Sequence, residues 1–117
     1  MILRLEGESC WRLGLIVSEL LTNVARHARF DDRHPEAKVK LLLAGSVVRC
    51  AVSDNGSASD LIVRGRGLTI VGGLASSLGG RVHASCAAEG SSFLLTFPLT
   101  EPEQRAACAT QIPEYLP

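Results

Sequence analysis

The 117-residue sequence has few aromatic residues, no net charge and no long hydrophobic run. Aromatic residues make up 4% of the chain, so a hydrophobic core must be mostly aliphatic. Twelve basic residues balance twelve acidic ones, which removes any bulk-charge argument for nucleic acid or an anionic membrane as partner. No apolar run approaches the roughly 18 residues of a transmembrane helix, and no signal pattern is visible. We therefore expect one domain with no membrane segment and no nucleic-acid partner.

The cysteines indicate a reducing compartment. Cys10, Cys50, Cys86 and Cys108 are scattered along the chain and lack the spacing of metal ligands. Cys50 and Cys86 fall at apolar positions of segments that alternate like strands. Because disulfides are rare in the cytosol, we interpret these two as reduced core residues of a cytoplasmic protein.

The most informative stretch is residues 15–29, which have the composition of a mostly buried helix. We expect the whole helix to have Ser9 as its N-cap and to end near residue 29. Glu19 and Asn23 lie four residues apart and therefore share one helical face. Burying an uncompensated polar group costs roughly 2–7 kcal/mol. The two side chains are thus either core polar residues with partners in the protein, or a polar line that faces a ligand cavity. The helix alone leaves both interpretations open.

The remaining patterns predict a two-layer α/β sandwich with a mixed sheet covered on one face by helices. Alternating runs separated by turn residues predict strands and hairpins, and apolar residues at helical spacing predict a second helix. We assign residues 1–98 to the domain and residues 99–117 to a C-terminal tail. The predicted elements are an edge strand at 1–6, hairpin strands at 37–44 and 47–53, a helix at 67–79, hairpin strands at 81–86 and 92–98, and a loosely held segment at 101–117.

Two further stretches have the composition of functional turns. Asp54-Asn55-Gly56 follows a predicted strand, and Gly65-Arg66-Gly67-Leu68 precedes the second predicted helix. By itself, the first is usually only a turn. The second would place backbone N–H groups at a helix start, where they can bind a phosphate.

In order and spacing, these stretches resemble the GHKL ATPase superfamily. They look most like the catalytic ATP-binding (HATPase) domain of bacterial sensor histidine kinases. Residues 19–28 are similar to the family's asparagine box, residues 52–56 to its first glycine box and residues 65–71 to its second. Residues 90–98 resemble its closing strand. The resemblance covers roughly residues 1–98 and implies a Bergerat-type fold.

The resemblance also implies a function. The domain would bind ATP and Mg²⁺ and donate the γ-phosphoryl group to a histidine on a separate dimerisation domain, in a pathway with a response regulator. Glu19 would orient or deprotonate the attacking group, Asn23 would coordinate Mg²⁺, and Asp54 would accept a hydrogen bond from the adenine amino group. The other implied nucleotide contacts are Arg26, His27, Gly56, Gly65, Gly67, Leu68 and Ser91.

Two alternatives stay open within the same fold. One is a serine kinase of the anti-sigma-factor type, which is a single domain of about this size. The other is a degenerate module that binds a partner without using ATP. This second alternative is favoured by Ala58 and Val63, which stand where the family usually has glycine. None of His27, His34 and His83 has the helical setting of a phospho-accepting histidine.

Overall fold

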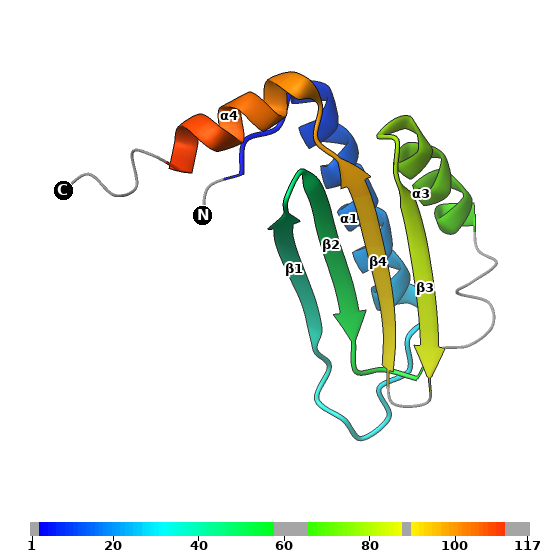
Figure 1. The fold of residues 1–117 in the computed structure, drawn as a ribbon. Helices are drawn as coiled ribbons and strands as arrows, with labels where there is room; N and C mark the ends of the chain where they lie inside the picture. The colour runs from blue at the N-terminus through cyan, green and yellow to red at the C-terminus, as the bar shows by residue number, and fades with distance from the viewer. Residues whose placement is uncertain (1–2, 58–65, 88–89, 112–117) are drawn as a thin grey trace.

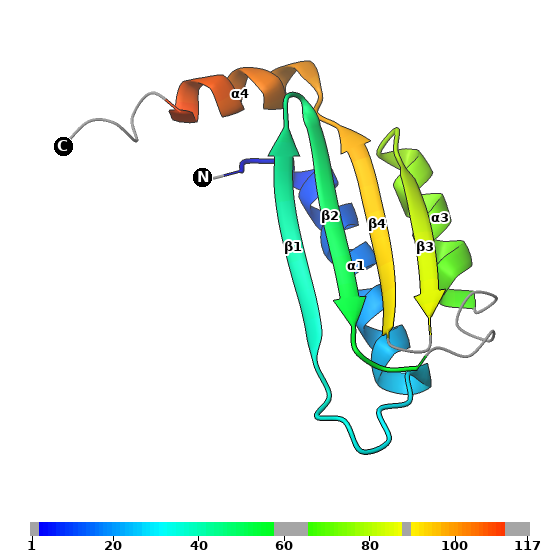
Figure 2. The ribbon, with the colours of Figure 1, turned by 60° about the horizontal axis from the view of Figure 1, so that its bottom comes forward.

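The computed structural model describes residues 3–57, 66–87 and 90–111, which form a two-layer α/β sandwich (Figure 1). The described strands make one sheet in the order β1-β2-β4-β3, and every neighbouring pair is antiparallel. Helices α1 and α3 lie on the same face of this sheet in both ribbon views (Figures 1 and 2). The bounds are α1 Gly7–His27, β1 Ala37–Ala44, β2 Val47–Asp54, α3 Arg66–Ser77, β3 Arg81–Ala87, β4 Gly90–Pro98 and α4 Glu101–Gln111.

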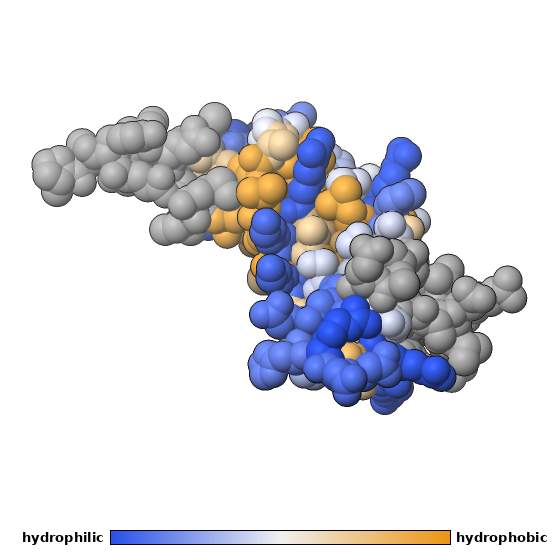
Figure 3. Space-filling model, turned by 90° about the horizontal axis from the view of Figure 1, so that it is seen from below, coloured by the Kyte–Doolittle hydropathy of each residue, from blue (hydrophilic) through white to orange (hydrophobic). Residues whose placement is uncertain are grey.

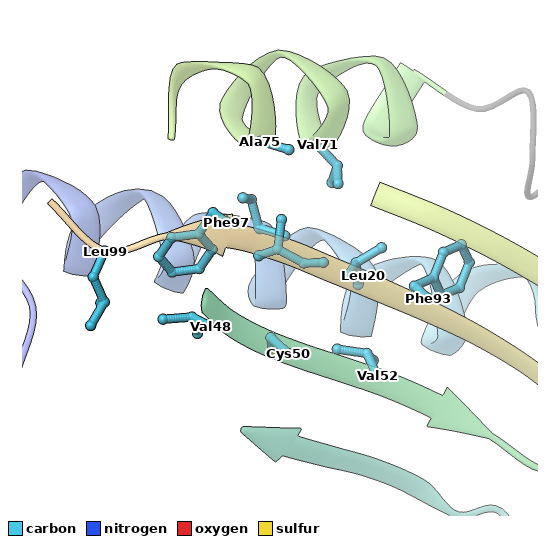
Figure 4. Packing of buried hydrophobic residues seen from close by; sticks show 11 residues of the cluster. Leu20, Val48, Cys50, Val52, Val71, Ala75, Phe93, Phe97 and Leu99 are labelled. Atoms are coloured by element: carbon cyan, nitrogen blue, oxygen red, sulfur yellow. The ribbon is translucent and has the colours of Figure 1, made fainter. Parts of the chain in front are cut away.

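The core lies between the two central strands and the two helices (Figure 4). Alternate residues of β2 and β4 point inward because successive strand side chains face opposite sides of a sheet. Full burial of an aliphatic or aromatic side chain of this size contributes about 1.5–3 kcal/mol. The core side chains are Val48, Cys50 and Val52 from β2, Phe93, Leu95 and Phe97 from β4, Ile16 and Leu20 from α1, Val71 and Ala75 from α3, and Leu99.

Strand β1 lies at the edge of the sheet and is poorly covered. Val39 and Leu41 pair with Val52 and Cys50, so they share the inward face as the alternation predicts. They nevertheless remain 47% and 40% exposed. The reason is that α1 packs on β2 while α3 packs on β3 and β4, which leaves β1 beyond the helical layer.

Both predicted hairpins and the second predicted helix are confirmed, with ends shifted by one or two residues. The turn between β1 and β2 is closed by Gly45 at φ +63°, and α3 ends before Gly79 at φ +74°. Both conformations favour glycine. We expected a mixed sheet, but the sheet of the described residues is antiparallel throughout. Both hairpins are antiparallel, and β2 also pairs with β4 in antiparallel orientation.

The start of the chain differs from the prediction. Residues 3–6 are not a strand: the Glu6 N–H donates to Glu103 Oε2 at 2.8 Å, and Leu3 and Leu5 pack against the core. Helix α1 begins at Gly7 with Glu6 at the N-cap, so Ser9 lies inside the helix, and it ends at His27 instead of near residue 29. The helix is also not buried all round, since Trp11 is 70% exposed.

The predicted loosely held segment at 101–117 is wrong for residues 101–111, which form α4. The Thr100 N–H donates to Glu103 Oε1 at 2.8 Å, and the Glu103 N–H donates to Thr100 Oγ1 at 3.3 Å. This reciprocal pair is a capping box, which satisfies N–H groups at the helix start. Among the described helices, none is long and apolar enough to cross a membrane.

Candidate functional site

The C-terminal end of α1 is fastened to the turn that follows β2. Arg29 and Ser57 form an antiparallel bridge: the Arg29 N–H donates to the Ser57 oxygen at 2.9 Å, and the Ser57 N–H donates to the Arg29 oxygen at 2.6 Å. Strand pairing sets Asp54 at the end of β2 opposite Ser91 at the start of β4. The second half of α1, the end of β2 and the start of β4 therefore meet at one end of the molecule.

Gly56 allows this close approach. It is buried, and a Cβ atom there would lie 2.9 Å from Ala28 Cβ and 3.1 Å from Phe30 Cε1. Any side chain would push the turn away from the end of α1. The family resemblance implies that Gly56 contacts the nucleotide, and the structure adds this packing reason.

Asn55 and Arg33 support the same turn, and sequence reasoning assigned neither a role. Asn55 Oδ1 accepts from the Glu36 N–H at 2.9 Å, and Asn55 Nδ2 donates to the His34 oxygen at 2.9 Å. Arg33 Nη2 donates to Ser57 Oγ at 2.8 Å. Asn in a turn often bonds nearby backbone, which is the one sequence signal that indicated this role. The predicted polar loop at residues 31–35 thus also clamps the turn.

Asp54 is half-buried, and its Oδ1 accepts from the Gly56 N–H at 2.8 Å. Burial raises the pKa of this carboxyl above its ordinary value. The N–H groups of Gly56 and Ser91 and the positive charge of Arg33 oppose that rise without cancelling it. A carboxyl group held in this way is a directed hydrogen-bond acceptor at the edge of the core.

Asn23 and Ser91 each have one buried side-chain atom that lacks a hydrogen-bond partner. They are 7% and 4% exposed, and neither Asn23 Nδ2 nor Ser91 Oγ has a hydrogen-bond partner. Buried polar atoms are normally paired, because desolvation without a partner is costly. Glu19 lies one turn before Asn23 on α1 and is half-buried, whereas Arg26 is exposed. The described residues thus leave one buried side-chain atom of α1 and one of β4 without a hydrogen-bond partner.

The other predicted contacts are described only in part. Gly67 is the second residue of α3, as expected for a helix start whose free N–H groups can meet an anion. Gly65, Ala58 and Val63 lie outside the described residues, and so do the side chains of His27 and Leu68.

A small polar pocket of about 120 Å³ lies beside this region but is not the predicted site. It is lined by Glu36, Lys38, Ser53, Asp54 and Asn55, and it includes no residue of α1. Hydrophilic side chains dominate this end of the molecule in Figure 3. The pocket therefore shares Asp54 with the predicted site but has no lining residue from α1.

The fold and this site define a class of protein. Residues 2–91 match the family of histidine kinase-like ATPase domains, and the chain belongs to that family. The family assignment agrees with the resemblance of the asparagine and glycine boxes, and the two-layer fold agrees with the predicted fold class.

Solved structures place the chain beside particular relatives. It is 30% identical to the histidine kinase domain of the blue-light activated histidine kinase EL346 from Erythrobacter litoralis, with a TM-score of 0.71, covering 82% of this chain and 50% of that one. Against another structure of the EL346 kinase the identity is 31%, the TM-score 0.67 and the coverage 88% and 33%. The catalytic domain of the histidine kinase ThkA shares the fold at 18% identity and a TM-score of 0.62, with coverage of 79% and 68%.

The chain therefore spans half of the EL346 kinase domain, and a third of the other EL346 structure. A comparison with curated proteins found no match.

Proposed function

We propose that this chain is the ATP-binding catalytic domain of a two-component histidine kinase. One observation carries the proposal: in a chain of the histidine kinase-like ATPase family, the buried and unpaired amide of Asn23 lies on the helix whose end is fastened to the turn holding Asp54. Two residues with predicted nucleotide roles are thus linked through backbone contacts, although 31 positions separate them in the sequence.

Each residue then has a distinct role toward ATP. Asp54 accepts a hydrogen bond from the adenine amino group with the carboxylate oxygen that Gly56 leaves available. Ser91, opposite Asp54 in the sheet, supplies a buried hydroxyl that has no other partner. Glu19 orients or deprotonates the attacking group, Arg26 lies near the phosphates, and the start of α3 provides backbone N–H groups for them. The acceptor is a histidine on a helical dimerisation domain, and a response regulator receives the group next.

The residues present fit a magnesium ion. An amide oxygen is a hard ligand of the kind that Mg²⁺ binds together with phosphate oxygens. Asn23 would hold the ion through its side-chain amide oxygen. When bound, Mg²⁺ would neutralise charge on the phosphates, where catalysis is mostly positioning and electrostatic stabilisation.

The proposal is tested by calorimetric titration of the chain with ATP, with and without Mg²⁺, and with GTP as the matched control nucleotide. We expect ATP binding that strengthens with Mg²⁺ and GTP binding that is weaker by at least about tenfold. Guanine presents a carbonyl where adenine presents the amine, so the Asp54 carboxylate would face a second acceptor. Equal affinity for ATP and GTP would sink the role of Asp54.

Phosphoryl transfer separates the proposal from its alternatives. Label from ATP on a histidine of a helical dimerisation domain supports the kinase, because phosphohistidine is stable to base and labile to acid. An acid-stable label on a partner protein indicates the serine kinase of the anti-sigma-factor type. Absence of ATP binding at millimolar concentrations indicates the degenerate, non-catalytic module.

A further inference from the structure

The face of the sheet that no described helix covers carries charge of one sign. The residues that alternate with the core positions of the four strands point to this face, which is open in Figures 1 and 2. Among them are Lys38, Lys40, Arg49 and Arg81, all exposed. No strand residue on this face is acidic, although the chain as a whole has equal numbers of basic and acidic residues. We call this surface the basic sheet face.

The four cations have no neutralising partner within the described residues. Within the described residues, none of the four takes part in an ion pair or a side-chain hydrogen bond. The ion pair found among the described residues joins Arg12 to Glu8 on α1 at 3.9 Å. Glu36 and Asp54 line a pocket with Lys38 at one end of the face, whereas no strand residue on the rest of the face is acidic.

Strand register places the cations on both sides of a diagonal line that joins two exposed leucines. Arg49 and Arg81 pair with Thr96 from its two sides, so their backbones are about 10 Å apart. Leu42 lies directly opposite Arg49, and Leu94 lies two residues from Thr96 on the same side of β4. These leucines are 59% and 38% exposed. The diagonal from Leu42 on β1 to Leu94 on β4 therefore has Arg49 and Arg81 on one side and Lys38 and Lys40 on the other.

We propose that the basic sheet face docks an acidic amphipathic helix of a partner protein, with the helix's apolar stripe on Leu42 and Leu94 and its flanking carboxylates on the four cations. Like charges on neighbouring strands repel, and a partner that brings carboxylates removes this repulsion while covering exposed aliphatic surface. The site is separate from the nucleotide site, which lies on the helix-covered side, so the proposal does not depend on the proposed function.

The same residues argue against other occupants. A second copy docked by two-fold symmetry would set two basic faces against each other, because such an interface uses the same patch twice. Single-stranded nucleic acid is bound by aromatic side chains that stack on the bases, and the described strands present none on this face.

The test uses the whole chain and a fluorescent 18-residue helical peptide designed with a leucine stripe flanked by glutamates. A peptide of the same composition in scrambled order, without a stripe, is the control. Anisotropy titrations are run at about 10 and 150 mM salt, where the screening length changes roughly fourfold. We expect the striped peptide to bind and to weaken with salt, and the scrambled peptide to bind at least about tenfold more weakly.

The double variant Lys40→Glu/Arg49→Glu should weaken binding of the striped peptide by roughly tenfold, since each reversal replaces an attraction with a repulsion. Its control is Arg4→Glu/Arg105→Glu, which makes the same charge change at exposed positions outside the face and should leave binding unchanged. Both variants should bind ATP like the parent chain. If the reversal variant does not fold, Lys40→Gln/Arg49→Gln replaces it, with a smaller expected loss.

Amide chemical shifts of the parent chain locate the bound peptide, and they should change along β1, β2, β4 and β3. Shift changes confined to α1 or α4 would overturn the proposal, as would equal binding of the two peptides. Retention of phosphatidylserine vesicles or of DNA at 150 mM salt without peptide binding would also overturn it, and would assign the face to a membrane or to nucleic acid.

Discussion

A structural role and a ligand-binding role for Asn23 predict different changes in the unfolding free energy when the side chain is removed. If the amide only satisfied a core hydrogen bond, its removal would cost about 1–3 kcal/mol. The structure shows no partner for Nδ2, so Asn23→Ala removes a buried donor that is already unpaired. We expect a change in unfolding free energy of less than about 1 kcal/mol, measured in urea. We expect the affinity for ATP with Mg²⁺ to fall by roughly tenfold or more.

The neighbouring variant Thr22→Ala is the control for Asn23→Ala. In the parent chain, the Thr22 hydroxyl donates to the Ser18 backbone oxygen at 2.8 Å within α1. Removing this hydroxyl therefore perturbs the helix without changing the Asn23 amide. Thr22→Ala should leave nucleotide affinity unchanged. A large loss of stability in Asn23→Ala with normal magnesium-dependent affinity would show that the amide is a structural residue.

Asp54 gives a pH-dependent prediction. Because burial raises its pKa in the folded state, the protonated form stabilises the fold. That contribution is fully present below the unfolded pKa of about 3.9 and is lost as pH rises through the raised folded pKa. Asp54→Asn, which keeps an acceptor for the Gly56 N–H, should therefore be at least as stable as the parent at pH 7.

The stability advantage of Asp54→Asn should disappear as the pH falls below about 4. The measurement is thermal unfolding of both proteins across pH, with ATP titration at neutral pH. The variant should lose most of its preference for ATP over GTP, because an amide donor would then be able to face the base. A variant that is much less stable than the parent at pH 7 would contradict the direction of the pKa shift.

At the scale of elements, Glu103 ties α4 to the start of α1. It is 2% exposed and accepts hydrogen bonds from the Thr100 N–H and the Glu6 N–H, each at 2.8 Å. Burial by itself would raise its pKa, but these backbone bonds and the hydroxyls of Thr100 and Ser9 together lower it. Glu103→Ala should cost about 1–3 kcal/mol of unfolding free energy at pH 7, because hydrogen bonds to a charged acceptor are lost.

The pH dependence of the unfolding free energy that Glu103 contributes has the opposite sign to that of Asp54. A lowered folded pKa gives stability that is present above the unfolded pKa of about 4.3 and is lost as pH falls through the folded pKa. The gap between the parent and Glu103→Ala should therefore narrow in acid. Glu101→Ala is the control, since Glu101 is exposed in the same first turn. An equal loss in both variants would mean that only the helix dipole is involved.

The elements also show what sequence patterns can and cannot predict. Period-two alternation located all four described strands, because one face of each central strand is buried and the pattern is strong there. The same alternation at residues 1–6 predicts a strand, but the described residues 3–6 do not join the sheet, and the Glu6 N–H donates to Glu103 of α4. Helix α4 is not predicted, because residues 101–117 contain three prolines and show no helical period. Thr100-x-x-Glu103 is nevertheless a capping-box signature, and Pro102 is tolerated in a first turn.

The sequence pattern identifies only those candidate-site residues whose polarity contrasts with their neighbours. Glu19, Asn23 and Asp54 stand out because charged and amide residues are rare in apolar runs. Arg33 and Asn55 do not stand out, because a polar residue in a polar loop carries no pattern. Their importance comes from the register that brings residues 33–36 beside the turn at 54–57, and this register is set by the tertiary fold.

At the scale of the whole molecule, the three histidines differ in their positions relative to the proposed nucleotide site. His27 is the last residue of α1, one turn after Asn23, and the helix fixes its backbone. The chain spans half of the EL346 kinase domain that it resembles. His83 pairs with Leu94 on the outer sheet face, opposite the helices, and His34 is exposed in the loop after α1. Neither of these two side chains lies on the helix that carries Asn23.

We therefore predict that this chain does not label itself stably when incubated with radioactive ATP and Mg²⁺. A helical dimerisation domain added in trans should become labelled, but slowly, because tethering normally supplies an effective concentration near millimolar. The label should survive base and be lost in acid. Asn23→Ala should abolish transfer, while Thr22→Ala should retain it. A stable label on this chain alone would refute the separation of donor from acceptor, because it would require one of its own histidines to reach the phosphate.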